Sequence, residues 1–401
     1  MIPLGSGDPL FADGVDLAVI LIVIGKLLAV FAFLMVGVLF MVWFERKIIA
    51  DMQNRIGPNR AGPFGLLQAL ADGTKLFFKE DLLPSRAERR VFHIAPYVSV
   101  IPAFASFAII PLGGEISIAG HKTYLQLADP PIGILFLLAM SSIAVYGVML
   151  AGWSSGSKYP LLASVRASAQ MVSYEAAINL AVVSTVLIAG SLSTRDIVNS
   201  QDGLFGWNFL QLGVVPFVIF LIAGTAESNR PPFDLVEAEQ EIVGGYHTEY
   251  SSLRFAIFYL AEYMNVITIS AIAITLFLGG PRGPGIPVLP DALDGVVWFL
   301  VKLLVFLFGY IWLRATLPRL RYDQLMNLGW KVLIPLALFW LLLIAALRVG
   351  RDAGWDSRLE IVMTLGIAVV IGGICWQTLG AALRLGERTA AATRTDEEAI
   401  V

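Results

Sequence analysis

DLAVILIVIGKLLAVFAFLMVGVLFMVWF, residues 16–44, is a long apolar run. It begins with the charged residue Asp16, and the only other charged residue in it is Lys26. A helix needs about 20 consecutive apolar residues to cross a bilayer, and this run is longer. The composition of the whole chain of 401 residues is similar, with 57% hydrophobic and 15% charged residues and a mean hydropathy of +0.76. Soluble domains carry about 25% charged residues. The sequence therefore predicts a polytopic membrane protein.

Further apolar runs along the chain predict a total of nine membrane-spanning helices. Gly- and Pro-rich turns separate them, such as PLGGE at 111–115 and GGPRGPG at 279–285. The predicted fold class is therefore an all-α polytopic membrane protein with nine transmembrane helices plus a cytoplasmic-side amphipathic helix. The spans are expected at residues 16–44, 95–112, 131–151, 170–190, 210–226, 254–279, 296–316, 331–348 and 359–381.

The distribution of Lys and Arg predicts the orientation of these spans. If the N-terminus lies outside, most of the 28 Lys and Arg residues fall in segments on the inner side. Cytoplasmic segments of membrane proteins are enriched in these residues. We therefore expect the C-terminus and the loops 45–94 and 227–254 in the cytoplasm. Residues 1–348 then form one domain of eight spans, and 349–401 add a ninth span and a polar tail.

The cytoplasmic loop 45–94 contains a predicted amphipathic helix over 64–79. At 100° per residue its apolar and polar side chains separate onto two sides. We expect this helix to lie in the membrane interface, although it could instead be a surface cap over helix ends. The apolar side is Leu66, Leu67, Leu70, Ala71, Phe77 and Phe78, and the polar side is Gln68, Asp72, Lys75 and Lys79.

Lys26, Glu175, Glu262 and Lys302 sit within apolar runs. An ionised group at mid-bilayer costs at least ~2.5 kcal/mol, so it normally faces a cavity or a partner. The structural alternative is a buried pair or a side chain that extends to the interface. This structural alternative is favoured for Lys26, because a long first helix can tilt. The short glutamates reach the interface poorly, which favours a functional role for them.

A second unusual stretch, AESNRPPFDLVEAEQEIVGGYHTEYSS at 226–252, concentrates acidic residues between two apolar runs. Asp234 is expected to cap a short helix in which Glu237 completes a D-x-x-E capping pattern. Glu237 and Glu241 then share one face, where like charges repel. Such carboxylates should share protons with raised, coupled pKa values. This pattern fits a proton relay, and a solvated acidic loop is the alternative.

The sequence also excludes several kinds of redox site. A single cysteine, Cys375, cannot form an internal disulfide framework or a CxxC site, and there is no cysteine cluster for an iron–sulfur centre. The three histidines do not form a pair on facing spans, which disfavours b-type haem. No strand-GxGxxG-helix unit for a nucleotide occurs. We therefore expect no redox centre and no metal site in this chain.

Two long segments resemble the family of the H subunit of NADH-quinone oxidoreductase, respiratory complex I. They are ERKIIADMQNRIGPNRAGPFGLLQALADGTKLFFKED at 45–81 and the acidic stretch 226–252. GWSSGSKYPLLASVRASAQMVSYE at 152–175, FYLAEYMN at 258–265 and LRATLPRLRYDQLM at 313–326 are similar as well. The resemblance covers roughly residues 17–348. The span 359–381 lies beyond the eight spans usual in the family and suggests a bacterial form.

The resemblance implies a non-redox membrane subunit of a proton-translocating NADH:quinone oxidoreductase. Such a subunit forms the quinone-access chamber with two peripheral-arm subunits, and an acidic relay couples quinone reduction to proton pumping. By position, the implied quinone-binding residues are Glu45, Arg46, Arg55, Arg60, Asp72, Phe258 and Arg314. The implied relay residues are Glu175, Glu227, Asp234, Glu237, Glu239, Glu241, Glu262 and Lys302.

The same resemblance implies the partners and the location of the chain. Quinone would be the substrate, no cofactor would be bound covalently, and iron–sulfur clusters, FMN and NADH would reside in partner subunits. Partners would be other complex I subunits and lipids of a bacterial inner (plasma) membrane, with no nucleic acid. Two alternatives stay open, an equivalent anchor subunit of a membrane-bound hydrogenase and a stand-alone ion transporter. The quinone-side segment disfavours the first, and the lack of internal repeats in the sequence disfavours the second.

Overall fold

A computed structural model describes residues 8–11, 14–118, 120–203, 206–211, 213–235, 243–285, 290–352 and 366. This part of the chain is mostly helical. Two short strands, β1 (Glu115–Ile118) and β2 (His121–Tyr124), pair antiparallel with Ile116 opposite Thr123. Short helical turns lie at η1 (Pro9–Phe11), η2 (Pro63–Gly65), η4 (Gly245–His247) and η5 (Gly329–Leu333, a π-helical turn). The α-helices are α1 (Leu17–Met52), α2 (Gln68–Phe78), α3 (Arg89–Phe107), α4 (Gly133–Ser154), α5 (Lys158–Ala189), α6 (Thr194–Ser200), α7 (Asn208–Gln211), α8 (Val214–Glu227), α10 (Ser252–Phe277), α11 (Asp291–Thr316), α12 (Tyr322–Leu328) and α13 (Ile334–Asp352).

Seven helical segments of the described residues are long and apolar enough to cross a membrane. They are α1, α3, α4, α5, α10, α11 and the continuous segment Tyr322–Gly350, and each falls on a predicted span. The predicted span 210–226 corresponds to α8, an apolar helix of only 14 residues. The predicted span 359–381 lies outside the described residues. The structure therefore supports a helical membrane protein, and the count of nine stays a prediction.

The largest difference in boundary concerns α5, which begins at Lys158 rather than at residue 170. Its first turns carry Lys158, Arg166 and several serines, which lower the hydropathy without preventing helical hydrogen bonds. The helix ends at Gly190, whose φ of 71° lies in the left-handed region. Glycine adopts this conformation without a Cβ clash, so it is the usual residue at a helix C-terminus.

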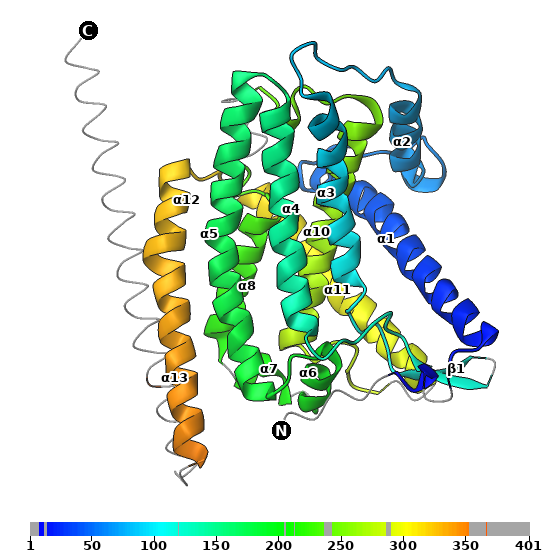
Figure 1. Cartoon of the computed structure of the whole chain (residues 1–401), viewed down its shortest axis with the longest axis vertical. Helices are drawn as coiled ribbons and strands as arrows, with labels where there is room; N and C mark the ends of the chain where they lie inside the picture. The colour runs from blue at the N-terminus through cyan, green and yellow to red at the C-terminus, as the bar shows by residue number, and fades with distance from the viewer. Residues whose placement is uncertain are drawn as a thin grey trace. The chain divides into compact units, whose positions relative to one another are not determined.

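The core of the bundle consists of α3, α4, α5, α8 and α10 (Figure 1). Small residues let these helices approach closely. A Cβ atom at Gly147 of α4 would lie 2.1 Å from Ser99 Oγ of α3, and one at Gly152 would lie 2.2 Å from Ser164 Oγ of α5. Close packing at small residues is how membrane helices associate when lipid is as apolar as their side chains.

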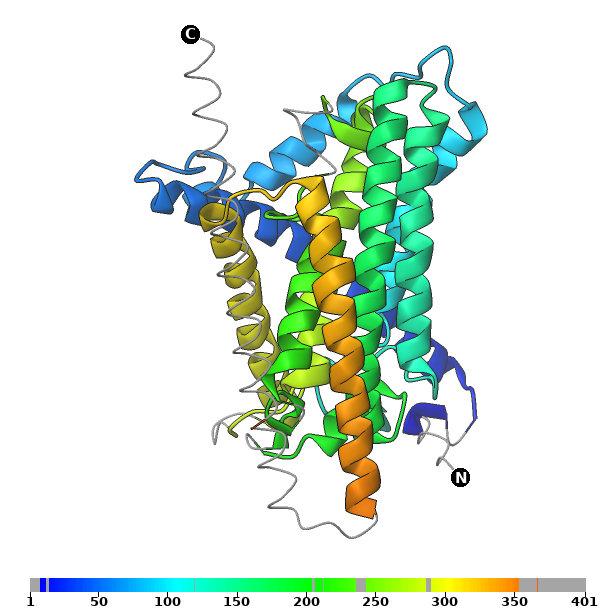
Figure 2. The same ribbon diagram turned by 90° about the vertical axis from the view of Figure 1, so that its left-hand side faces the viewer.

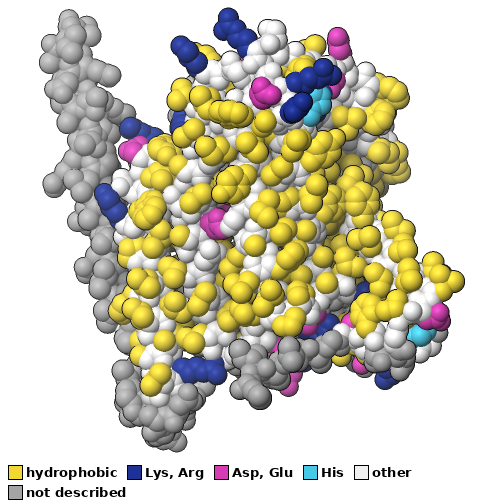
Figure 3. Space-filling model, in the orientation of Figure 1, with side chains coloured by type: hydrophobic (Ala, Val, Ile, Leu, Met, Phe, Trp, Pro, Cys, Tyr) yellow, Lys and Arg dark blue, Asp and Glu magenta, His cyan; other side chains and the backbone are white. Residues whose placement is uncertain are grey.

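The surface of the bundle is apolar in its middle. Figure 3 shows hydrophobic side chains over the middle of the visible face and Lys and Arg side chains near its two ends. Helix α1 leans away from the core helices (Figure 1) and exposes Leu21, Leu28 and Phe31. An exposed apolar belt of this kind suits contact with lipid.

The predicted helix 64–79 forms over the shorter range of α2, Gln68–Phe78. It crosses the core helices at a steep angle (Figure 2). Its polar side is bonded within the chain, because Arg46 Nη1 donates to Asp72 Oδ2 at 2.7 Å and Gln68 Nε2 donates to Asp72 Oδ1 at 3.2 Å. Its apolar side remains exposed, with Phe77 at 63%. The helix is confirmed, and its place in the membrane interface stays a prediction.

Lys26 forms a buried pair, one of the two structural alternatives that the sequence favours for it. Its Nζ donates to Asp8 Oδ2 at 3.1 Å and to Thr123 Oγ1 at 2.9 Å, and the Lys26 side chain is 9% exposed. A buried ammonium group needs such partners because it has lost its water. The contact joins Asp8, which precedes η1, to α1 and β2.

Candidate functional site

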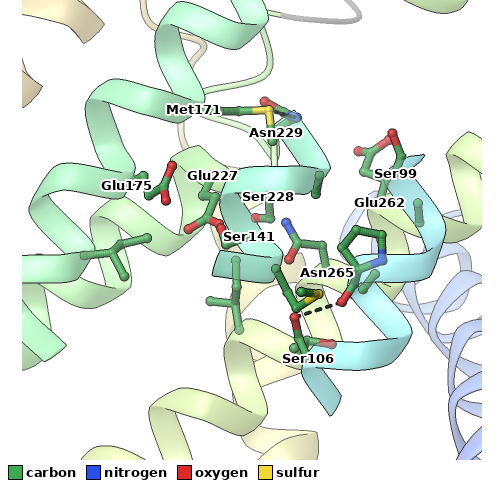
Figure 4. Close-up of a pocket in the computed structure, with 18 of the residues that line it drawn as sticks. Ser99, Ser106, Ser141, Met171, Glu175, Glu227, Ser228, Asn229, Glu262 and Asn265 are labelled. Atoms are coloured by element: carbon green, nitrogen blue, oxygen red, sulfur yellow. Dashed lines mark hydrogen bonds between the residues drawn. The ribbon is translucent and has the colours of Figure 1, made fainter. Parts of the chain in front are cut away.

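A mostly apolar cavity of about 70 Å³, with several polar side chains in its wall, lies between α3, α4, α5, α8 and α10 (Figure 4). A single water needs about 10–15 Å³ of such space, so the cavity can hold water. Its lining includes three carboxylates, Glu175 of α5, Glu227 of α8 and Glu262 of α10. The sequence predicted each as a relay residue, and the structure brings all three to one cavity.

Two adjacent serines of α4 contact two of these carboxylates. Ser141 Oγ donates to Glu227 Oε1, and Ser142 Oγ donates to Glu175 Oε1. Figure 4 shows the Glu175 and Glu227 side chains directed toward each other, with Glu262 on the far side of Asn265. The first two glutamates therefore form a hydroxyl-bonded pair at one side of the cavity.

Other polar atoms on the cavity wall have no protein partner. Ser99 Oγ, Asn179 Oδ1 and Thr268 Oγ1 line the cavity, are buried and make no hydrogen bond with the described protein. Buried polar atoms nearly always bond to protein or to ordered water. Their shared position indicates that water is their partner.

The third carboxylate, Glu262, pairs with the single arginine of the acidic stretch. Arg230 Nε lies 3.5 Å from Glu262 Oε1, and both side chains are buried. The guanidinium also lies over the Tyr263 ring, 3.9 Å from its centroid. Burial lowers the pKa of Arg230, but the Glu262 carboxylate and the tyrosines outweigh that effect and raise it above its ordinary value. Arg230 therefore stays charged.

Arg230 also reaches a second glutamate, on α1. Its Nη1 lies 3.8 Å from Glu45 Oε2. Glu45 accepts a hydrogen bond from Arg314 Nη1 of α11 and another from Tyr263 Oη at 3.0 Å. Tyr259 Oη lies 2.9 Å from Tyr263 Oη. A connected set of buried and partly buried polar groups thus runs from α1 and α11 to the cavity lined by Glu175, Glu227 and Glu262, which we call the glutamate cavity.

The predicted quinone-binding residues fall into four places. Glu45 and Arg314 belong to the connected polar set, Arg46 pairs with Asp72 of α2, and Arg55 and Arg60 lie on the exposed segment between α1 and α2. Phe258 is 2% exposed and lines the glutamate cavity, where its ring packs edge-on against Tyr246 and Tyr250. The structure does not place Phe258 with Glu45.

The remaining predicted relay residues lie apart from the cavity or outside the described residues. Asp234 Oδ2 accepts a hydrogen bond from Arg319 Nη2 at 3.1 Å. Lys302 Nζ donates to the carbonyls of Leu278, Gly280 and Arg282 at 2.6, 2.9 and 2.6 Å, at the end of α10. Glu237, Glu239 and Glu241, and the short capped helix predicted for them, fall outside the described residues.

Sequence reasoning missed the residues that connect the carboxylates. Arg230 is the single arginine of the acidic stretch 226–252, and that isolation was the available signal. Ser141 and Ser142 are a polar pair inside an apolar run, which gives a weaker signal. Gln170 was also missed, and its Nε2 donates to the carbonyls of Ala226 and Phe233 at 2.8 and 2.9 Å. These bonds hold the start of the acidic stretch against α5.

Comparison with known proteins assigns the family. The family model described as NADH dehydrogenase matches residues 25–345. A relative from Frankia alni, named as the H subunit of NADH-quinone oxidoreductase, is 54% identical over 86% of this chain and 76% of its own length. A relative of the same name from Frankia casuarinae is 55% identical over the same shares. The chain belongs to the family of the H subunit of NADH-quinone oxidoreductase, whose members are membrane subunits of complex I.

Proposed function

We propose that this chain couples quinone reduction to proton movement within a proton-translocating NADH:quinone oxidoreductase. The observation that supports this proposal is the series of buried and partly buried charged groups between two places in the fold. One end lies where α1 meets α11, and the other is the glutamate cavity. The groups, in order, are Arg314, Glu45, Arg230 and Glu262, followed by Glu227 and Glu175.

The proposed quinone site lies at the α1 end of this set. Helix α1 contacts α2, α10 and α11, and a slot walled by these helices would admit an apolar quinone tail from the bilayer. Arg46 and Arg55 would donate hydrogen bonds to the quinone carbonyls and offset the negative charge that develops during reduction. The electrons would come from an iron–sulfur cluster in a partner subunit, and two protons would complete the quinol.

The proposed relay starts from the position of Arg230 between two carboxylates. Arg230 lies 3.8 Å from Glu45 and 3.5 Å from Glu262. A change of charge at Glu45 would alter how strongly Arg230 stabilises ionised Glu262, because a nearby cation favours the charged form of a carboxyl. The change would then reach Glu227 and Glu175 across the cavity. Asp234, Glu237, Glu239 and Glu241 would supply protons from the cytoplasmic side. Lys302, whose Nζ donates to backbone carbonyls at the end of α10, would be a further charged member of the relay.

The same proposal includes the orientation and the assembly of the protein. The N-terminus would lie outside and the acidic stretch on the cytoplasmic side of a bacterial inner membrane. Other complex I subunits would carry FMN, the NADH site and the iron–sulfur clusters. The chain would act only inside that assembly, because its own residues offer a binding site and proton carriers but no electron carrier.

A direct test replaces Glu262 with Gln in the assembled complex, reconstituted in liposomes. Glutamine keeps the size and hydrogen-bonding capacity of the side chain but cannot ionise, so we expect the rate of proton pumping to fall about tenfold or more. Quinone reduction should slow with it, because the two processes are coupled. NADH oxidation and the proton gradient are measured together.

The matched control is Glu115→Gln. Glu115 lies in β1 and pairs with Lys122 at 3.2 Å, and the side chains of Lys122 and Glu115 are 71% and 43% exposed. This variant should pump at the parental rate. Parental rates of both quinone reduction and pumping in Glu262→Gln would remove Glu262 from the relay.

A further inference from the structure

Ser141 and Ser142 are adjacent hydroxyls within the apolar helix α4. Consecutive residues of an α-helix point about 100° apart, so the two side chains can reach two different neighbouring helices. Ser141 bonds to Glu227 of α8, and Ser142 bonds to Glu175 of α5. One turn of α4 therefore holds both carboxylates of the hydroxyl-bonded pair.

Ser142 differs from Ser141 because it has a second acceptor within reach. Its Oγ lies 3.1 Å from the backbone carbonyl of Leu138, one turn earlier in α4. A hydroxyl carries one hydrogen and two acceptor lone pairs, so it can donate to Glu175 or to Leu138 but not fully to both. If Glu175 is ionised, Ser142 donates to it. If Glu175 is protonated, Glu175 can donate to Ser142 Oγ while the hydroxyl hydrogen turns to Leu138.

We propose that Ser142 is a positioning residue, a hydroxyl switch that keeps Glu175 hydrogen-bonded in both of its protonation states, while Ser141 holds Glu227 next to it. This inference rests on the proposed relay. The switch transfers no proton itself, because the Ser142 O–H bond stays intact and only rotates. The proton that Glu175 takes up arrives from, and leaves to, water or another carboxyl of the cavity.

The surroundings of the serine pair suit such an exchange. The other titratable groups that line the cavity in the described residues are Glu227, Glu262 and Tyr246, and no Lys or Arg of the described part lines it. Tyr310 of α11 interacts electrostatically with Glu227 from the other side. Asn179 Oδ1, one turn beyond Glu175, is one of the buried atoms with no protein partner. The groups around Glu175 are thus hydroxyls, an amide and the carboxyls of the same cavity.

The test uses the full complex in liposomes with Ser142→Ala, Ser142→Thr and a matched control, Ser184→Ala. Ser184 is a buried serine of α5 whose Oγ donates to the Leu180 carbonyl at 3.1 Å. Protons pumped per NADH are measured, and the carboxyl C=O band of Glu175 is followed by infrared difference spectroscopy. The band is assigned by its loss in Glu175→Gln.

We expect Ser142→Ala to displace the Glu175 band and to lower pumping about tenfold, the size expected for loss of a hydrogen bond to a charged group. Ser142→Thr, which keeps the hydroxyl, should restore both, and Ser184→Ala should change neither. If the alanine variant does not assemble, Ser142→Cys replaces it. A thiol is a weak donor of similar size, so the band should again be displaced.

The inference and the relay can fail separately. If Glu175→Gln stops pumping while Ser142→Ala or Ser142→Cys leaves the band and the pumping unchanged, the switch is wrong and the relay stands. If Glu175→Gln pumps at the parental rate, the proposed role of Glu175 is wrong, and the switch is overturned with it. A displaced band in Ser184→Ala would also overturn the assignment to Ser142.

Discussion

Two kinds of buried glutamate lie close together in this chain, and they differ in their partners. Glu45 and Glu262 contact the guanidinium of Arg230 at 3.8 and 3.5 Å, whereas Glu175 and Glu227 accept hydrogen bonds from serine hydroxyls. We call the first two the arginine-paired glutamates and the other two the serine-bonded glutamates. A cation stabilises only the ionised carboxylate, but a hydroxyl can bond to either protonation state. The same residue type can therefore hold charge in one place and exchange protons in the next.

The largest expected effect comes from removing the cation of the arginine-paired glutamates. Arg230→Met should leave two buried carboxylates without their shared partner, at a cost of about 3–5 kcal/mol. We expect little assembled complex in the membrane and a markedly lower melting temperature for what assembles. Both are measured on purified membranes by native gel and by thermal denaturation.

Arg282→Met is the matched control for this prediction. Arg282 pairs with Asp202 at 2.7 Å, but their side chains are 36% and 94% exposed. Surface pairs contribute about 0–1 kcal/mol, so this variant should assemble normally. If Arg230→Met were as abundant and as stable as Arg282→Met, the arginine-paired glutamates would not depend on their cation.

A smaller effect should separate the two kinds of glutamate by stability alone. Glu262→Gln removes one of the two carboxylates that balance buried Arg230, so we expect a loss of about 1–3 kcal/mol. Glu227→Gln leaves no cation behind, and Ser141 can still donate to the amide oxygen. Its loss should stay below about 1 kcal/mol. Melting temperatures of the two assembled variants, compared side by side, measure the difference, and equal losses would contradict the distinction.

Hydropathy and charge in the sequence were enough to predict most of the helices and the ionisable residues inside them. Seven predicted spans correspond to long apolar helices, and Glu175 and Glu262 stand out because ionised groups in apolar runs are costly. The differences between the predicted spans and the observed helices have a local origin. α8 is short and α5 begins in a polar segment, and a hydropathy window measures neither helical hydrogen bonding nor helix length.

The partners of these residues could not be predicted, because they are far apart along the chain. Arg314 and Glu45 are separated by 269 positions, and Ser141 and Glu227 by 86. A single sequence contains no information that brings such positions together, and only the packed helices do so. The pairing of Lys26 with Asp8 and Thr123 was missed for the same reason, since neither partner lies on its own helix.

The smallest loss of stability is expected from a substitution of Asp8. Asp8 sharpens the comparison of the arginine-paired and serine-bonded glutamates, because its carboxylate has both a cation and a hydroxyl as partners. Its carboxylate accepts from the Thr123 hydroxyl at 2.8 Å and from the Lys26 ammonium at 3.1 Å. Burial raises the pKa of Asp8, but the Leu10 amide, Thr123 and Lys26 together lower it below its ordinary value of 3.8. The stability that ionised Asp8 gives the folded protein is therefore fully present above the ordinary pKa. It is lost as the pH falls through the lower pKa that Asp8 has in the folded protein.

Asp8→Asn should accordingly cost at most about 1 kcal/mol near neutral pH, because the amide oxygen of Asn can still accept from Lys26 and Thr123. The cost should shrink as the pH falls below about 4. The melting temperature of the assembled complex, followed against pH for the parent and the variant, measures this convergence.

Lys26→Met is the complementary variant, because it leaves the Thr123 hydroxyl in place. If the hydroxyl alone holds Asp8 as it holds the serine-bonded glutamates, Lys26→Met should lose less stability than Asp8→Asn does at neutral pH. A larger loss in Lys26→Met would show that the cation, and not the hydroxyl, is the dominant partner at this end of the molecule.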